Sequence, residues 1–314
     1  MNKKKILMLT LTVLVLMSGC LPATDGDSAK STDSEELVSA GESQVLPAES
    51  SDECKTAEQV EVCFFDVGQG DCILISTPAG KHILIDSGTL ESKDKVMGFL
   101  SNKGVKEIEY AFFTHPHADH IGAADEIINR LDVKNVYMPD AAATTMVFER
   151  LLEALESKES VNVVKAHAEQ IIELDSLIFE ILSPIKNDYY ELNQFSIVIK
   201  MTHGENVFLF MGDATTENEE EMQNAGMELD ADIIKVGHHG SAGSTSVDFL
   251  DAVTPKIAVI SVGANNDYSH PADSIIEKLN DIKTYRTDID GTIIVYSGGI
   301  HSLEVSSIKP DFSD

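Results

Sequence analysis

The sequence predicts two β-sheets packed face to face with helices on their outer sides, formed by one domain that covers residues 60–314. Three observations support this fold class. Hydrophobic residues make up 43% of the 314 residues and charged residues 24%, which is ordinary for a globular protein. Short β-branched or apolar runs alternate with segments of helical spacing in both halves of this region. No repeat of about 20–50 residues is present in the sequence, which argues against a solenoid or a propeller.

The predicted elements follow from the spacing of apolar residues along the chain. Apolar runs between Gly and Pro turns predict strands, and apolar residues three and four positions apart predict helices. An acidic helix is expected from Thr215 to Gly226, because threonine is a good N-cap and glycine commonly ends a helix. Further helices are expected at 121–131, 144–155, 247–252 and 275–279, and strands at 60–66, 72–76, 82–86, 108–114, 133–138, 161–165, 177–182, 195–201, 207–211, 233–236, 257–262, 292–296 and 302–305.

The first twenty residues resemble a bacterial lipoprotein leader. Three lysines, Lys3 to Lys5, precede an apolar run at 6–17, which is shorter than the ~20 residues that span a bilayer. Met17-Ser18-Gly19-Cys20 resembles the lipobox, in which the cysteine is lipidated. We therefore expect a signal peptide at 1–19 and a protein anchored outside the cytoplasm through lipidated Cys20, on the cytoplasmic membrane or in an outer membrane. An ordinary signal peptide and an uncleaved anchor stay open as alternatives.

Charge is the unusual feature of the composition. The chain has 23 basic and 53 acidic residues, and its formal net charge is −30. Residues 20–59 hold ten acidic residues against two lysines and show no apolar periodicity, so we expect an acidic disordered tether there. The acidic balance argues against stable nucleic-acid binding through a broad basic face.

The cysteines do not suggest a disulfide framework. Cys63 and Cys72 lie in apolar, strand-like runs, which predicts buried free thiols. A disulfide between Cys54 and one of them stays open.

The strongest chemical signal lies directly after the strand predicted at 108–114. His115, His117, Asp119 and His120 place three imidazoles and one carboxylate within six residues. Residues two apart in an extended segment point the same way, so His115 and His117 form one donor set, and Asp119 and His120 can form a second. Nitrogen and oxygen donors of this kind suit Zn²⁺, and two adjacent sets suit a pair of metals ~3.5–4 Å apart.

This motif and others resemble the metallo-β-lactamase superfamily, and in particular the metallo-hydrolase domain of the ComEC/Rec2 competence proteins. The resemblance implies an αββα sandwich, in the α+β class, with a metal site at the edge of two mixed β-sheets, here as a stand-alone lipoprotein. The matching segments occur in the same order as in that family and cover nearly all of 60–304. They are 65–71 (FDVGQGD), 83–88 (ILIDSG), 114–122 (THPHADHIG), 211–213 (MGD), 235–241 (KVGHHGS), 261–263, 266–271 (NDYSHP) and 285–291 (YRTDIDG).

The resemblance also implies roles for individual residues. It implies that His115 and His117 hold the first metal, that Asp119, His120 and His239 hold the second, and that Asp213 bridges both. Asp86 and Asp71 are expected to orient these ligands by hydrogen bonding. Asp119, Asp213, His238 and His270 are the expected catalytic residues. Substrate contacts are expected from Ser241, Tyr268 and His270. Ser241, Ser244 and Thr245 precede a predicted helix, and two interpretations stay open for them: they bind an anion at its N-terminus, or they only cap it.

The sequence departs from common superfamily practice at one ligand position. Many members place a further histidine on the first metal, before the strand that carries Asp213. Here that region, 192–196, reads Leu-Asn-Gln-Phe-Ser, and the next histidine, His203, lies in a predicted hairpin turn, where we expect it at the surface. The first metal is therefore expected to keep an open face. Lys235 and Arg286 are the nearest basic candidates for substrate binding.

These residues predict a hydrolase with two divalent metal ions, zinc first and manganese as an alternative. The expected reaction is hydrolysis of a phosphodiester, in DNA or an envelope polymer, by a nuclease-like enzyme outside the cytoplasm. Three alternatives stay open. One is a cell-envelope phosphodiesterase that resembles the phosphorylcholine esterases of teichoic acid, although the absence of Trp disfavours an aromatic choline cage. The others are a lactam or lactone acyl hydrolase and a non-catalytic metal-binding lipoprotein.

Overall fold

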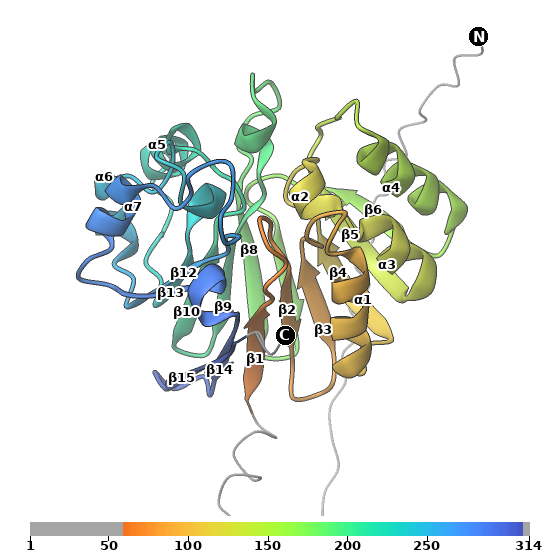
Figure 1. Ribbon diagram of the computed structural model, residues 1–314, viewed down its shortest axis with the longest axis horizontal. Coiled ribbons are helices and arrows are strands. Elements are labelled where there is room, and N and C mark those ends of the chain that lie inside the picture. The colour runs from red at the N-terminus through yellow and green to blue at the C-terminus, as the bar shows by residue number, and fades with distance from the viewer. Residues whose placement is uncertain (1–58, 310–314) are drawn as a thin grey trace, which may run out of the picture. The chain divides into compact units, whose positions relative to one another are not determined.

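The computed structural model describes residues 59–309. The predicted signal peptide, Cys20, Cys54 and nearly all of the predicted tether lie outside the described residues. The described chain folds into two β-sheets that pack face to face, with helices on both outer sides (Figure 1). The predicted αββα architecture is therefore confirmed.

The first sheet has eight strands in the order β15-β14-β1-β2-β3-β4-β5-β6, and the second has seven in the order β13-β12-β11-β10-β9-β8-β7. Both are mixed, because β3 to β6 run parallel in the first sheet and β10 to β13 in the second. The strands are β1 (Val60–Phe64), β2 (Ile73–Ser76), β3 (His82–Ile85), β4 (Glu107–Phe112), β5 (Asp132–Met138), β6 (Asn162–Lys165), β7 (Ile171–Leu174), β8 (Leu177–Ser183), β9 (Val198–His203), β10 (Asn206–Phe210), β11 (Ile233–Lys235), β12 (Ile257–Ile260), β13 (Lys283–Arg286), β14 (Thr292–Ser297) and β15 (Leu303–Ile308).

The helices divide between the two outer faces. Over the first sheet lie α1 (Lys93–Asn102), α3 (Ala124–Arg130) and α4 (Met146–Ser157), and over the second lie α5 (Thr216–Asn224), α6 (Val247–Val253) and α7 (Asp273–Lys278) (Figure 1). The short elements α2 (Ala118–Ile121), α8 (Thr287–Asp290) and the 3₁₀ turns η2 (Leu192–Phe195) and η3 (Gly237–Gly240) connect strands near the ends of the sheets. Among the described residues, no helix is long and apolar enough to cross a membrane.

Alternation along the strands explains why three apolar cores form. In β10, Phe208 and Phe210 point between the sheets, whereas Leu209 points to the helices on the outside. In β1, Phe64 likewise faces the central core, and Cys63 faces α1 and α3. Successive side chains of a strand point to opposite faces, so a nearly continuous apolar run is what a sheet buried on both sides requires.

The predicted buried thiols are confirmed for both described cysteines. Cys63 and Cys72 are free and buried in the core beneath the helices of the first sheet. Burial raises the pKa of the Cys63 thiol to about 12, because the thiolate would lose its hydration there.

Several elements differ from the prediction. Helix α1 and strands β7 and β13 were not predicted, because each buries few side chains. Helix α1 buries only Val96 and Leu100, β7 only Ile172 and Leu174, and β13 none. The helix predicted at 121–131 is α3, which begins only at Ala124, because Ile121 is the last residue of the separate short helix α2. Between the two helices, an added Cβ on Gly122 would lie 2.1 Å from the carbonyl carbon of Thr89. The strand predicted from residue 195 begins at Val198, after η2.

The expectation that His203 lies at the surface is wrong. His203 is buried, and its Nδ1 lies 2.8 Å from Ser297 Oγ. The hairpin turn after β9 packs against the turn after β14, since Glu205 N donates to Gly299 O at 2.9 Å. That contact joins the two sheets and covers the imidazole, and it brings together residues about ninety positions apart.

Candidate metal centre

The site lies where parallel strands of both sheets end. The segment after β4 carries His115 and His117 and leads into α2, which carries Asp119 and His120. The turn after β10 carries Asp213, and η3, directly after β11, carries His238 and His239. The carboxyl ends of parallel strands meet at one edge of a sheet, so these three segments converge although they are far apart in the sequence.

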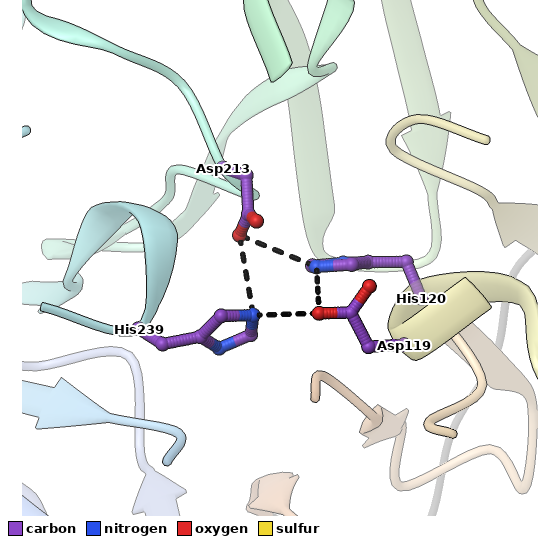
Figure 2. Close-up of side chains that lie close together, drawn as sticks. All are labelled: Asp119, His120, Asp213 and His239. Atoms are coloured by element: carbon purple, nitrogen blue, oxygen red, sulfur yellow. Dashed lines mark ion pairs between the residues drawn. The ribbon is translucent and has the colours of Figure 1, made fainter. Parts of the chain in front are cut away.

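Four side chains form the centre of the site. One donor atom from each of Asp119, His120, Asp213 and His239 lies within 4.8 Å of the others. His120 Nε2 is 3.3 Å from Asp213 Oδ1, and His239 Nε2 is 3.6 Å from the same oxygen. Asp119 Oδ2 closes the ring at 3.4 Å from His239 Nε2 and 3.9 Å from His120 Nε2 (Figure 2). We call these four residues the carboxylate–imidazole cluster.

The donor atoms of this cluster fit a divalent metal ion. Among the described residues, His120 Nε2, His239 Nε2 and Asp213 Oδ1 are buried and have no hydrogen-bond partner. Buried polar atoms without a partner are rare and call for an explanation. All three point at one place from different directions (Figure 2), and imidazole nitrogen with carboxylate oxygen is a donor set that zinc favours.

The outer nitrogens of both cluster histidines have partners that orient the rings. His120 Nδ1 lies 2.7 Å from Asp86 Oδ2, and Asp86 is held in turn by Thr114, whose N and Oγ1 both donate to it at 2.7 Å. His239 Nδ1 donates to Ser261 O at 2.9 Å. Such partners hold the outer proton on Nδ1 and direct Nε2 inward. Asp86 therefore stands where the sequence predicted an orienting carboxylate.

A buried ion pair lies behind the cluster. Lys235 and Asp71 form an ion pair, and both side chains are 1% exposed or less. Lys235 Nζ also donates to Gly212 O at 3.1 Å, beside Asp213, and Asp71 Oδ1 is 3.5 Å from His239 Nδ1. Lys235 is thus an internal residue, and the expectation that it contacts substrate is wrong. Arg286 instead pairs with Asp288 on α8.

His115 and His117 lie beside the cluster on its other side. His115 Nε2 is 2.9 Å from His117 Nδ1 and 3.8 Å from Asp213 Oδ2, so the two rings turn toward each other and toward the shared carboxylate. The His115 Nδ1 atom lies 3.1 Å from Thr114 Oγ1 and 3.4 Å from Ser196 Oγ. Ser196 also accepts from Asp213 N at 3.1 Å, so a serine stands in the region where many superfamily members have a histidine.

The local charges determine which groups are protonated. Burial by itself would lower the pKa of His120, but Asp213, Asp86 and Asp119 raise that pKa well above its usual value. Burial would likewise raise the pKa of Asp213, yet His120 and His239 lower it. Burial and the neighbouring His120 lower the pKa of His115. The carboxylates are therefore charged and available as ligands.

A cavity of about 330 Å³ opens from the cluster. Its wall contains His238 and His270, whose ring centroids lie 5.5 Å apart, and Asn193, whose Nδ2 is 3.2 Å from His238 Nε2. The remaining lining comes from Gln69, His117, Ala118, Asp119, Thr145, Asp213, His239 and Tyr268. The structure thus brings His238, His270 and Tyr268 together at the cavity. Asn193 and Thr145 were not predicted as site residues, because single amides and hydroxyls carry no distinctive sequence signal.

The adjacent histidines have different environments although both have left-handed backbones, with φ of 46° at His238 and 52° at His239. His239 is buried in the cluster, and His238 is partly exposed toward the cavity. The left-handed conformation at two successive residues turns the chain so that the neighbouring side chains point to different places. This conformation is costly for residues other than glycine, but it is tolerated at functional sites.

Ser241 lies outside the cavity lining, and its Oγ accepts from Gly243 N at 3.3 Å within its own loop. Of the two interpretations of Ser241, Ser244 and Thr245, capping is not seen, because the cap of α6 is Ser246, whose Oγ accepts from Phe249 N at 3.2 Å. Anion binding is opposed by a carboxylate. The buried carboxylate of Glu219 already accepts from Thr245 N and from Ser246 N. A second anion there would meet a carboxylate, so this part of the predicted substrate site is closed.

The comparisons with known proteins agree with this geometry. A family model described as the metallo-beta-lactamase superfamily matches residues 65–264. The chain belongs to the metallo-β-lactamase superfamily. Its members are largely metal-dependent hydrolases that bind a dinuclear metal site. CmlA, a diiron β-hydroxylase from Streptomyces venezuelae, shares the fold with a TM-score of 0.50 and 15% identity, over 80% of this chain and 54% of that one.

Sequence relatives include competence proteins, which confirms the predicted resemblance. ComE operon protein 3 of Bacillus subtilis is 33% identical over 252 residues, which cover 74% of this chain and 32% of the relative. Competence protein ComA of Neisseria gonorrhoeae is 29% identical over 239 residues, and Recombination protein 2 of Haemophilus influenzae is 28% identical over 264. These two matches cover 75% and 81% of this chain and 32% and 31% of the relatives. The chain thus spans about a third of the length of these relatives.

Proposed function

We propose that this chain is a phosphodiesterase of nuclease-like type that uses two divalent metal ions. The observation that carries the proposal is the position of the carboxylate–imidazole cluster in the wall of a cavity that also contains two further imidazoles, His238 and His270. Two relatives are named as a competence protein and a recombination protein, which favours a nucleic-acid phosphodiester as substrate.

The chain has donors for both metal ions. Asp119, His120 and His239 would hold one ion, His115 and His117 would hold the other, and Asp213 would be shared between them. Nitrogen and carboxylate donors suit zinc, and manganese is the alternative. The chemistry that bound divalent ions supply is polarisation of a phosphoryl oxygen and a lowered pKa of a water molecule.

The chain's own groups would place the substrate and move the protons. Burial lowers the pKa of both His238 and His270, so both rings are neutral at pH 7 and each has one N–H to donate. His270 lines the cavity, and its Nδ1 is buried without a partner among the described residues. These rings would donate to a phosphoryl oxygen or to the leaving oxygen, and Asp119 and Asp213 would orient the attacking water.

A substrate panel tests this proposal. The purified domain is expected to hydrolyse bis-p-nitrophenyl phosphate and DNA and to leave nitrocefin intact. His117→Ala and Asp213→Ala should lose the diesterase activity. His301 is exposed and pairs with Glu205, and His301→Ala should retain the activity. Cleavage of nitrocefin with no activity on either diester would rule the proposal out and favour an acyl hydrolase.

We also propose that the enzyme is anchored outside the cytoplasm through lipidated Cys20, as its leader predicts. The full chain should incorporate labelled palmitate and sediment with membranes, and Cys20→Ala should do neither. External protease should remove the wild-type domain from spheroplasts. Protection from protease, or unchanged palmitate labelling in Cys20→Ala, would contradict the anchor.

A further inference from the structure

We propose that a second cavity beside the cluster is a subsite for the uncharged ring of a nucleotide that adjoins the scissile phosphodiester, with Tyr268 as its stacking platform. The proposal rests on the proposed phosphodiesterase function and names the substrate class as single-stranded nucleic acid. It is carried by the shared walls of two cavities, by the residues that line the second one, and by the hydrogen bonds that hold the Tyr268 loop.

The two cavities are neighbours that share part of their walls. The second has a volume of about 360 Å³ and shares Gln69, Ala118, Asp119 and Tyr268 with the cavity at the cluster. Its volume falls in the range of about 300–1,000 Å³ that is usual for small-molecule sites. Because Asp119 belongs to both walls, a substrate held at the cluster would extend directly into the second cavity.

The lining of the second cavity selects against a phosphate. Besides the shared residues, it contains Thr89, Leu90, Glu91 and Val147. None of the described side chains around either cavity is a lysine or an arginine, and Glu91 and Asp119 are both acidic. A second phosphate of a polymer would meet the negative charge of Glu91 there, without a lysine or arginine to offset it. An uncharged group with apolar faces would instead contact Leu90 and Val147.

Tyr268 offers a flat face for such a group. The residue is 67% exposed, and its ring lies 5.7 Å from the His270 ring at an interplanar angle of 27°. An exposed aromatic ring at the edge of a catalytic cavity is a platform on which a nucleobase stacks. A polyol phosphate, such as an envelope polymer would supply, has no flat ring to use it.

The loop that carries Tyr268 is held in place before any ligand binds. Asn266 Oδ1 accepts from Tyr268 N at 3.1 Å and from His270 N at 3.0 Å, and Asn266 Nδ2 donates to Gly263 O and His270 O. Gly263 N donates in turn to Gln69 Oε1 at 3.0 Å, on the shared wall. A preorganised platform binds with less loss of entropy than a mobile one.

The test uses one missing base. A single-stranded oligothymidylate is compared with the same strand that carries one abasic tetrahydrofuran residue, so that the two substrates differ by one ring and have equal charge. Wild-type protein is expected to cut a bond next to the abasic residue about 5- to 150-fold more slowly than the equivalent bond in the intact strand. Tyr268→Leu, which keeps bulk and loses the aromatic face, should remove most of that bias, and Tyr268→Phe should keep it.

Each outcome decides one question. Equal cutting of both strands by the wild type, or an unchanged bias in Tyr268→Leu, would overturn the subsite. Hydrolysis of bis-p-nitrophenyl phosphate without cleavage of oligothymidylate would also overturn it and leave the phosphodiesterase function standing. If neither is hydrolysed, the proposed function fails, and fluorescence anisotropy then decides the subsite. Tighter binding of oligothymidylate than of a fully abasic strand, lost in Tyr268→Leu, supports it, and equal binding overturns it.

Discussion

On the side of the site formed by His120 and His239, the outer nitrogen of each ring has a carboxylate or carbonyl partner at 2.7–2.9 Å. On the side formed by His115 and His117, the outer nitrogen of His115 has only hydroxyl partners, at 3.1 and 3.4 Å. The first side is backed by the buried Lys235–Asp71 pair, and both sides reach the cavity, the first through Asp119 and His239 and the second through His117. We infer from these partners that the rings of the first side are held more firmly than His115 on the second side.

The largest effect is expected at the residue common to both sides. Asp213→Ala removes the carboxylate that lies within 3.8 Å of His115, His120 and His239. The amount of metal bound per protein molecule should therefore fall on both sides. Activity should fall by more than the ~10–100-fold that loss of an outer partner costs. Metal analysis and diesterase rates measure this, with the exposed Asp248→Ala as control. Full retention of one metal would show that the two sides are independent.

The next largest effect is expected when the buried Lys235–Asp71 ion pair behind the first side is broken. Lys235→Met leaves the Asp71 carboxylate buried without its cation, and breaking such a pair costs ~3–5 kcal/mol in the free energy of unfolding. Urea denaturation measures this loss. The double variant Lys235→Met, Asp71→Leu should recover most of the stability, because an apolar pair replaces the charges, and should still bind metal more weakly. Full recovery of metal affinity would mean that the ion pair stabilises the fold and has no effect on metal binding.

Outer partners on the two sides should differ in importance. Asp86→Asn should weaken metal binding by ~10–100-fold, because His120 loses the carboxylate that raises its basicity. Ser196→Ala should cost less, since its hydroxyl is a neutral and longer partner of His115. Competition of both variants with a chelating dye gives the two affinities. Equal losses would mean that the sides are equally constrained.

The smallest effect is expected in the reactivity of the two buried thiols, Cys63 and Cys72. Cys72 follows Asp71 directly, and burial raises the pKa of its thiol well above the usual value, as it raises that of Cys63 to about 12. Both should react with a thiol reagent only when the native protein opens. A reagent that is slow in the wild type and faster in Lys235→Met would report loosening of the first side. Rapid labelling of native protein at pH 8 would contradict the closed packing.

Much of the fold could be predicted because it depends on local patterns. The nearly continuous apolar runs of β1, β9 and β10 are visible in the sequence and predict a sheet covered on both faces. Strand β13 and helix α1 escaped prediction because they bury few side chains, so their apolar pattern is weak. The close approach of Gly122 to the backbone of Thr89, between α2 and α3, is a contact that no local pattern shows.

The sequence by itself determined the identity of the donors and the family, because the histidines and Asp119 stand within six residues after a strand and the other motifs follow in order. Tertiary structure alone decided which polar residues face the cavity. It buried Lys235 against Asp71 and His203 against Ser297, and it placed Glu219 where an anion site was one of two interpretations. The physical reason is that a charge or a ring nitrogen is exposed or buried according to the residues packed on it, and here those residues come from distant strands.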